Sequence, residues 1–354
     1  MSAPSIMTIV GARPQFIKAA ALSRVIQSTG QLREYIVHTG QHFDDNMSEI
    51  FFRELSIPVP WRHLGIGGGG HGAMTGRMLI GLEELVKSDR PDAILVYGDT
   101  NSTLAGAITA AKMQIPLIHV EAGLRSFNRA MPEEINRLIA DQLSSLLFCP
   151  TEASVTNLRN EGNGAQIETV GDINFDATLF AMQQSRSRSE IVETLELSGK
   201  RFALCTLHRA ENTDDLDRLN KIVQFIEHQA KELNVILPLH PRTRAVFKAN
   251  HIVPKGVRVI DPLGYFDIHA LMAGCDIVIT DSGGMQKEAY FHARPCITLR
   301  DETEWVETIQ AGWNRLWTED DWSAPRRTIH DYGDGKAANK IVNHIVDFLG
   351  NCRS

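Results

Sequence analysis

The chain has 354 residues, which is long for a single hydrophobic core and makes two domains the first expectation. Its 43% hydrophobic and 22% charged residues are typical of a globular protein in water. The net charge of −7 argues against nucleic acid or a membrane as partner, so an anionic ligand must be met by local basic residues and backbone amides.

Cysteine usage and the N-terminus indicate a cytoplasmic protein. The five cysteines are scattered without a CxxC pair, which predicts buried, reduced thiols and neither disulfides nor a zinc site. No apolar run approaches the roughly 18 residues of a membrane helix, and the first residues lack the pattern of an export signal.

Short apolar runs alternate with helix-length segments along the chain. In the first half the predicted strands and helices are residues 6–12, 14–30, 34–40, 46–55, 93–99, 102–114, 116–123 and 132–145. After residue 170 the alternation restarts with residues 201–207, 218–233, 235–241, 257–263, 267–275, 276–284, 286–293 and 295–301. Buried strands separated by helices indicate parallel βαβ units with helices on both faces of a sheet.

Two such series predict an α/β protein with two doubly wound domains, residues 1–170 and 171–335, followed by an amphipathic helix within 336–354. Ligands of open parallel sheets bind beyond the carboxyl ends of the strands. We therefore expect the ligand in a cleft between two facing domains.

Basic residues follow the first predicted strand. In "GARPQFIK", Arg13 and Lys18 stand at the entrance of a helix whose first position suits Pro14. Two cations beside helix-end amides can hold a diphosphate. The alternative is an ordinary helix start with solvated basic side chains.

Acidic residues recur where later strands of the first half end. They are Asp99 in "YGDTNST", Glu121 with Arg125 in "HVEAGLRS", and Glu133 and Glu134 in "MPEEINR", one turn before Arg137. Singly, an N-cap explains Asp99 and a favourable charge at a helix start explains the glutamate pair. Acids at three separate places in one domain favour a functional cluster instead.

Histidine and arginine follow two strands of the second half. His208, Arg209 and Glu211 lie in "TLHRAEN". His240 and Arg242 lie in "LPLHPRT". A histidine in this place carries a proton or donates to an anionic group, whereas a capping or core histidine is the structural alternative.

The stretch "DIVITDSGGMQKEA" predicts a phosphate site. Asp281 ends a strand and Ser282 is positioned to cap a helix, while Gly283 and Gly284 let the backbone approach a ligand so that N–H groups point at its phosphates. Glu288 follows one turn later, within reach of a sugar hydroxyl. A nucleotide's diphosphate and ribose fit this arrangement.

The run "GIGGGG" at residues 65–70 matches GxGxxG by letter only. It follows no buried strand, and the acid of a dinucleotide site is missing. We interpret it as a mobile loop over a ligand.

These motifs, in this order and spacing, resemble the non-hydrolysing UDP-N-acetylglucosamine 2-epimerases of bacteria over almost the whole chain. The resemblance implies a glycosyltransferase-B-type fold, a C-terminal helix that packs back on the first domain, a homodimer, and a UDP-sugar as ligand without metal or other cofactor. By their place in the motifs, Asp99, Glu121, Glu133 and His208 match the family's catalytic residues. The matched substrate- and UDP-binding residues are Arg13, Lys18, Arg137, Arg209, His240, Ser282, Gly283, Gly284 and Glu288.

Three segments depart from the commonest family pattern. They are "GARPQFIK", "DETEWVE" with Trp305 where many members have arginine, and the longer "HTGQHFDDNM". All three resemble the subgroup that epimerises UDP-2,3-diacetamido-2,3-dideoxy-glucuronate for O-antigen synthesis. UDP-N-acetylglucosamine is the main expectation for the substrate, and the diacetamido glucuronate is the alternative.

The family's reaction inverts C2 by eliminating UDP to a 2-acetamidoglucal and adding it back. Such chemistry needs carboxylates near C2 and cations at the leaving diphosphate. The rival readings are a glycosyltransferase of the same fold, a hydrolysing epimerase and a non-catalytic UDP-sugar-binding protein. Several strand-end acids argue against the first and the last of these.

Overall fold

The computed structural model describes residues 3–41, 54–55, 57–322 and 324–353. They form two compact units: unit 1, Met1–Ala177 with His330–Ser354, and unit 2, Thr178–Ile329. The helix predicted over residues 46–55 lies almost entirely outside the described residues, as does most of the segment "HTGQHFDDNM".

Unit 1 is built on a parallel sheet with the strand order β3-β2-β1-β4-β5-β6-β7 among the described residues. Its strands are β1 (Ser5–Val10), β2 (Arg33–His38), β3 (Arg62–His63), β4 (Ala93–Tyr97), β5 (Leu117–Val120), β6 (Leu146–Cys149) and β7 (Gln166–Thr169). Its helices are α1 (Arg13–Thr29), α3 (His71–Ser88), α4 (Asn101–Lys112), α5 (Pro132–Leu143), α6 (Glu152–Asn160) and α15 (Ala337–Arg353), with a 3₁₀ turn at His330–Tyr332. The helix α7 (Ile173–Arg188) begins in unit 1 and continues into unit 2.

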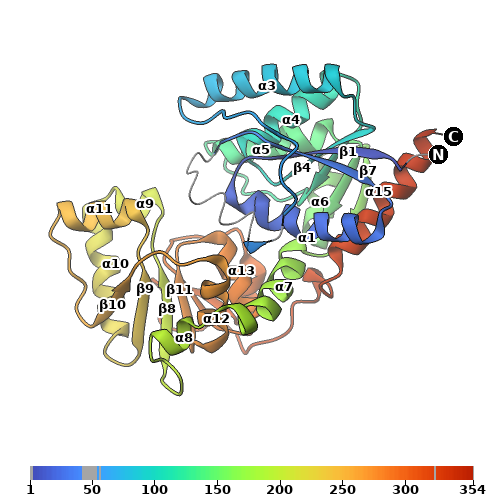
Figure 1. Ribbon diagram of the computed structural model, residues 1–354. Coiled ribbons are helices and arrows are strands. Elements are labelled where there is room, and N and C mark those ends of the chain that lie inside the picture. Colours follow the sequence, from blue (N-terminus) through green and yellow to red (C-terminus); the bar gives the residue numbers. More distant parts are fainter. Residues whose placement is uncertain (1–2, 42–53, 56, 323, 354) are drawn as a thin grey trace. The chain divides into compact units, whose positions relative to one another are not determined.

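Helices cover both faces of this sheet, as its buried central strands β1, β4, β5 and β6 require. Helices α3, α4 and α5 pack together over one face, where Met78, Leu82 and Ala107 join side chains of β1 and β4 in one core. Helix α15 lies beside α1 (Figure 1). The N-terminal amides of α15 are held by Asp176, whose carboxylate accepts from Ala337 N at 3.1 Å and from Ala338 N at 2.9 Å.

Unit 2 contains a second parallel sheet, with the order β10-β9-β8-β11-β12-β13. Its strands are β8 (Phe202–Thr206), β9 (Asn234–Pro238), β10 (Val257–Ile260), β11 (Ile277–Thr280), β12 (Cys296–Thr298) and β13 (Asn314–Leu316). Its helices are α8 (Ile191–Thr194), α9 (Ala210–Thr213), α10 (Leu216–Gln229), α11 (Pro241–Ala249), α12 (Tyr265–Gly274), α13 (Gly283–Phe291) and α14 (Val306–Gln310). The α/β class with two parallel sheets is therefore confirmed.

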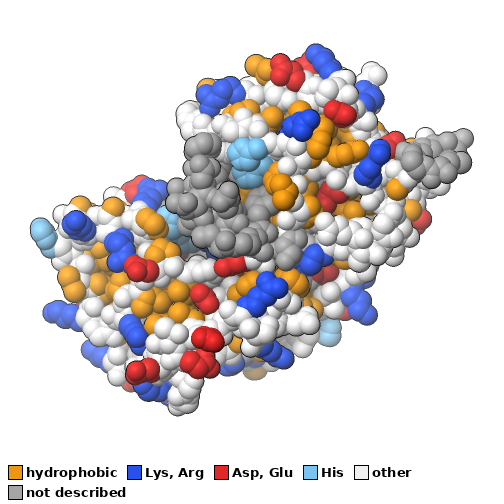
Figure 2. Space-filling model, in the orientation of Figure 1, with side chains coloured by type: hydrophobic (Ala, Val, Ile, Leu, Met, Phe, Trp, Pro, Cys, Tyr) orange, Lys and Arg blue, Asp and Glu red, His pale blue; other side chains and the backbone are white. Residues whose placement is uncertain are grey.

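Successive residues of β8 point to opposite faces and enter separate cores. Ala203 and Cys205 pack with α10 and α11, whereas Phe202 and Leu204 pack with α12 and α13. The described cysteines are all free. No helix of the described chain is long and apolar enough to cross a membrane. Over the face drawn in Figure 2, acidic and basic side chains are interspersed.

Candidate active site

Each sheet reverses its strand order beside its first strand, and the predicted site residues follow the strands at these reversals. β1 lies between β2 and β4, and β8 lies between β9 and β11. Loops that leave two neighbouring strands in opposite directions open a crevice at the strands' carboxyl ends, where ligands of such sheets bind. Arg13 and Asp99 follow β1 and β4, and His208 and Ser282 follow β8 and β11.

Glu121 and Lys18 form a buried ion pair in unit 1. Lys18 Nζ lies 2.6 Å from Glu121 Oε1, and the two side chains are only 8% and 10% exposed. The other carboxylate oxygen accepts from Asn174 Nδ2 at 3.2 Å. A carboxylate and an ammonium so far removed from water fix one another's position and charge.

Asp99 is held by Arg137 rather than by a helix end. The N-cap of α4 is Thr100, whose side chain accepts from Thr103 N, so the interpretation of Asp99 as a cap is wrong. The Asp99 carboxylate instead pairs with Arg137. Removal from water raises the pKa of Asp99, and the charges of Arg137 and Lys18 only partly oppose this rise. A carboxyl with a raised pKa is suited to proton transfer near neutral pH.

The paired glutamates at the start of α5 have different surroundings. Glu134 is buried and accepts from Ser126 N at 2.9 Å and Phe127 N at 3.0 Å, besides contacting Arg137 at 3.0 Å. Burial favours a higher pKa for Glu134, but these donors hold it below its usual value. Glu134 thus anchors the preceding loop, whereas Glu133 is exposed in the same turn and free for other contacts.

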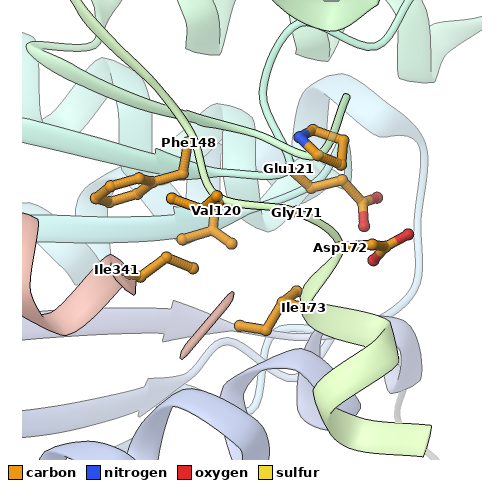
Figure 3. A pocket seen from close by; sticks show the side chains of 9 residues that line it. Val120, Glu121, Phe148, Gly171, Asp172, Ile173 and Ile341 are labelled. Atoms are coloured by element: carbon orange, nitrogen blue, oxygen red, sulfur yellow. The ribbon is translucent and has the colours of Figure 1, made fainter. Parts of the chain in front are cut away.

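A small pocket of unit 1 lies next to Glu121. Its lining residues are Val120, Glu121, Phe148, Pro150, Val170, Gly171, Asp172, Ile173 and Ile341. Figure 3 shows the carboxylates of Glu121 and Asp172 directed to the same side, away from Phe148 and Ile341. Asn174 Nδ2 also donates to Asp172 Oδ1 at 3.0 Å, so one amide links both acids. The lining residues leave almost no room between them, so this pocket alone is no site for a UDP-sugar.

In unit 2, Asp281 orients His208. Asp281 is fully buried and accepts from the backbone N–H of His208 at 2.9 Å and of Arg209 at 2.8 Å. Its other oxygen lies 3.0 Å from His208 Nδ1, while the His208 side chain is 43% exposed. Burial alone would raise the pKa of Asp281, but His208 and these N–H groups hold it below its usual value. The imidazole is therefore fixed at Nδ1 with its other nitrogen available to a ligand.

The start of α13 is open to a ligand. Ser282 is the N-cap residue, but its side chain makes no cap hydrogen bond, so that part of the sequence prediction is wrong. A Cβ on Gly284 would meet no atom within 4 Å, whereas one on Gly283 would lie 2.6 Å from Glu304 Oε1. The first N–H groups of a helix lack intrahelical partners and favour anions.

The remaining predicted site residues lie in different environments. His240 is the N-cap of α11 and accepts from Arg242 N at 3.3 Å, which is the structural alternative considered for it. Arg242 pairs with Asp214 at 2.8 Å on the surface. Arg13 is exposed, and Arg209 and Glu288 are half-buried, so all three are within reach of solvent.

Trp305 lies against α13. It is 7% exposed, and Lys287 Nζ sits 3.8 Å from the centroid of its ring. Its indole nitrogen lies 3.5 Å from the position that a Cβ of Gly283 would occupy. The substitution that sets this chain apart from the common family pattern therefore borders the predicted phosphate site.

Several residues that hold the loops of this site are assigned no role from the sequence. Gln15 accepts from Gly11 N at 2.9 Å and donates to the Tyr97 carbonyl at 2.9 Å, which fastens the loop after β1 to the end of β4. Asp172 and Asn174 lie in "GDINFD", which is outside all of the motifs described above. Among the described residues, no cluster of three histidine, cysteine or acidic side chains could hold a metal ion.

Comparison with known proteins identifies the class. The family model for UDP-N-acetylglucosamine 2-epimerase matches residues 24–346. The UDP-2,3-diacetamido-2,3-dideoxy-D-glucuronate 2-epimerase of Pseudomonas aeruginosa is 49% identical, covering 96% of this chain and 99% of the relative. A UDP-N-acetylglucosamine 2-epimerase homolog of Methanococcus maripaludis is 48% identical over 88% of each chain.

A solved structure agrees with these relatives. The UDP-GlcNAc 2-epimerase of Methanocaldococcus jannaschii, crystallised with UDP-GlcNAc and UDP, superposes with a TM-score of 0.86 at 38% identity, covering 98% of this chain and 99% of the other. Two Rossmann-like units of the glycosyltransferase-B type are thus the shared fold. The chain belongs to the UDP-N-acetylglucosamine 2-epimerase family. It is a UDP-sugar 2-epimerase, an isomerase.

Proposed function

We propose that this enzyme inverts C2 of UDP-2,3-diacetamido-2,3-dideoxy-glucuronate without hydrolysing it. The observation that carries the epimerase chemistry is the pair of carboxylates, Asp99 and Glu121, at the ends of neighbouring strands β4 and β5, each paired with a cation. The choice of sugar is supported by the 49% identity to the relative of that name. This choice is also supported by Trp305, which lies beside the start of α13 and belongs to a segment that resembles the diacetamido glucuronate subgroup.

The C2 proton of such a sugar is not adjacent to a carbonyl group, so simple deprotonation is unfavourable. In the proposed reaction a carboxylate removes the C2 proton while the C1–O bond to UDP breaks, leaving a glycal and free UDP. UDP then adds back to C1 as a proton is delivered to the opposite face of C2. We assign proton transfer to Asp99, Glu121 and Glu133, and stabilisation of the leaving diphosphate to His208 and the first amides of α13.

The substrate is tested by incubating purified enzyme with each UDP-sugar alone and measuring kcat/KM. We expect the diacetamido glucuronate to be preferred at least ~10-fold, which is about 1.4 kcal/mol of transition-state binding. If UDP-N-acetylglucosamine is converted at least as efficiently, it is the substrate instead. Release of free sugar would identify a hydrolysing enzyme, and no product from either sugar would leave only a binding protein.

The assigned acids are tested by isosteric amides. Asp99→Asn, Glu121→Gln and Glu133→Gln keep size but remove proton transfer, which typically contributes about 10²–10⁴-fold. Each variant is expected to lose kcat far beyond any change in UDP affinity measured by calorimetry. Near-normal turnover in all three would show that the carboxylates only support the fold.

We further propose that the enzyme is a homodimer that supplies a precursor of O-antigen polysaccharide. The dimer is supported by the resemblance and by apolar side chains on unit 1 that meet solvent, with Ile80 on α3 63% exposed and Leu143 on α5 38% exposed. Sedimentation equilibrium tests the dimer: a monomer at micromolar concentration contradicts it.

A further inference from the structure

A buried histidine contacts the turn that precedes Asp99 and lies two residues before Glu121 in the chain. His119, in the middle of β5, is fully buried. Its Nδ1 lies 2.7 Å from Asp141 Oδ1 and its Nε2 lies 2.8 Å from the carbonyl oxygen of Gly98. Both ring nitrogens therefore have a hydrogen-bonding partner, one on α5 and one in the turn after β4.

Asp141 on α5 links His119 to the turn after β5. It is fully buried, and its Oδ2 accepts from Gly123 N at 3.1 Å and contacts Arg125 Nη1 at 2.7 Å. Arg125 in turn reaches Glu161 at 2.7 Å. Burial opposes ionisation, but His119 and Arg125 hold the pKa of Asp141 below its usual value. The network therefore runs from His119 through Asp141 and Arg125 to Glu161.

The two ends of this network are the turns that present Asp99 and Glu121. Gly98, which accepts from His119, has φ of +58° and immediately precedes Asp99. Glu121 itself has φ of +69°, in the left-handed region, and lies between His119 and Gly123. The chain is thus held just before Asp99 and on both sides of Glu121, a non-glycine residue whose left-handed conformation needs support.

We propose that His119 and Asp141 are positioning residues that hold the backbone turns of Asp99 and Glu121 in the geometry required for epimerisation. The inference rests on the proposed function, in which these two acids transfer the C2 proton. Neither His119 nor Asp141 is open to the substrate, so each acts only through the turns. A displacement of about 1 Å in a reacting group is enough to lower a rate by roughly 10²-fold.

Two substitutions at His119 separate the two halves of the network. In His119→Asn the side-chain amide takes the place of Nδ1 and can still contact Asp141, but the bond to the Gly98 carbonyl is lost. In His119→Gln the amide nitrogen takes the place of Nε2 and can still donate to Gly98. We expect kcat to fall about 10²-fold in the asparagine variant, with KM and the Kd for UDP changed less than about threefold, and to recover substantially in the glutamine variant.

A matched control removes a different hydrogen bond to the same residue. Asn163 Nδ2 donates to the backbone carbonyl of Asp141 at 2.8 Å, a contact that reaches neither turn. Asn163→Ala is expected to leave kcat unchanged. Asp141→Asn tests the network from its other end and is expected to repeat the fall in kcat; it carries the test alone if His119→Asn does not fold.

The result that overturns the inference is a folded His119→Asn or Asp141→Asn enzyme with kcat near that of wild type. Equal losses of kcat in the asparagine and glutamine variants, accompanied by a lower melting temperature, would also overturn it by showing a purely structural role. Failure of the proposed function is distinguished by Asp99→Asn and Glu121→Gln, which would then retain turnover whatever His119 does.

Discussion

Glu121 has the least favourable backbone among the residues assigned to proton transfer. Its φ of +69° places a residue with a large side chain in the left-handed region, which glycine adopts readily and other residues adopt rarely. Such a conformation costs on the order of 1–3 kcal/mol and persists only where the surroundings enforce it. Lys18 and Asn174, which both contact the carboxylate, are among the groups that enforce it here.

This strain predicts an inverted order of stability for two variants. Glu121→Ala and Glu121→Gly both remove the carboxylate that pairs with Lys18. The two variants differ mainly in how readily residue 121 adopts a left-handed backbone conformation. At an ordinary position alanine stabilises a protein more than glycine does. At positive φ we expect the reverse, with the free energy of unfolding of the glycine variant higher by about 1 kcal/mol. Urea unfolding followed by circular dichroism measures the difference. An alanine variant of equal or greater stability would mean that the turn relaxes without its carboxylate.

The sequence singles out Asp99 and Glu121 and the cations that pair with them, Arg137 and Lys18, but not His119 and Asp141. Asp99 and Glu121 are visible because charged residues at the ends of apolar strands stand out. His119 is hidden inside the apolar run of residues 116–120, and Asp141 inside an amphipathic helix pattern. The available signal was chemical: a histidine within a fully buried strand must find partners for both nitrogens, which predicts a buried acid nearby.

At the scale of one element, helix α13 illustrates what a motif can and cannot specify. The strand, the two glycines and the helix start follow from "DIVITDSGG", because the apolar run and the glycines are local features. The side-chain direction of Ser282 is not local. It depends on neighbours such as Thr280, whose Oγ1 accepts from Ser282 N at 3.0 Å. The predicted cap is therefore absent, and the open amides of the first turn remain for a ligand.

The open start of α13 yields a test of the UDP site. A valine at position 283 would displace the carboxylate of Glu304, so a loss of UDP binding in Gly283→Val could not be assigned to the glycine alone. Gly284→Val extends into space where no atom lies within 4 Å, so the fold should tolerate it while the branched side chain blocks a diphosphate. We expect UDP affinity to fall at least ~10-fold, about 1.4 kcal/mol, with an unchanged melting temperature.

The matched control is Gly350→Val in α15, another helical glycine with nothing within 4 Å, which should bind UDP normally. Wild-type affinity in a folded Gly284→Val enzyme would place the diphosphate elsewhere.

At the scale of the whole molecule, the two units repeat one design. Each contains a parallel sheet with its own core, and each holds a fully buried aspartate that accepts hydrogen bonds from a loop after a strand: Asp141 in unit 1 and Asp281 in unit 2. Alternating strands and helices were sufficient to predict both sheets. The burial of Asp141 and Asp281 follows from three-dimensional packing, which no single-sequence periodicity reports.

These two carboxylates predict how the protein responds to acid. Both have a pKa held below the usual value in the folded state, by His119 and Arg125 for Asp141 and by His208 for Asp281, against the opposing effect of burial. A group with a lowered folded pKa contributes stability that is fully present above its unfolded pKa, near 4 for aspartate, and is lost as the pH falls through the folded value. Wild-type stability should therefore decline below about pH 4.

Four of the five tryptophans, at positions 305, 313, 317 and 322, lie in unit 2. Tryptophan fluorescence therefore reports mainly on the unfolding of unit 2, and the loss of stability in acid can be assigned to one unit. Asp281→Asn cannot ionise, so the difference in melting temperature from wild type, followed by tryptophan fluorescence, should be largest near pH 7 and shrink below about pH 4. Asp141→Asn should leave the fluorescence transition nearly unchanged and alter the one seen by circular dichroism. A difference for Asp281→Asn that stays constant from pH 7 to pH 3 would mean that the carboxylate of Asp281 contributes no charge-dependent stability, since a neutral and an ionised partner would then hold His208 equally well.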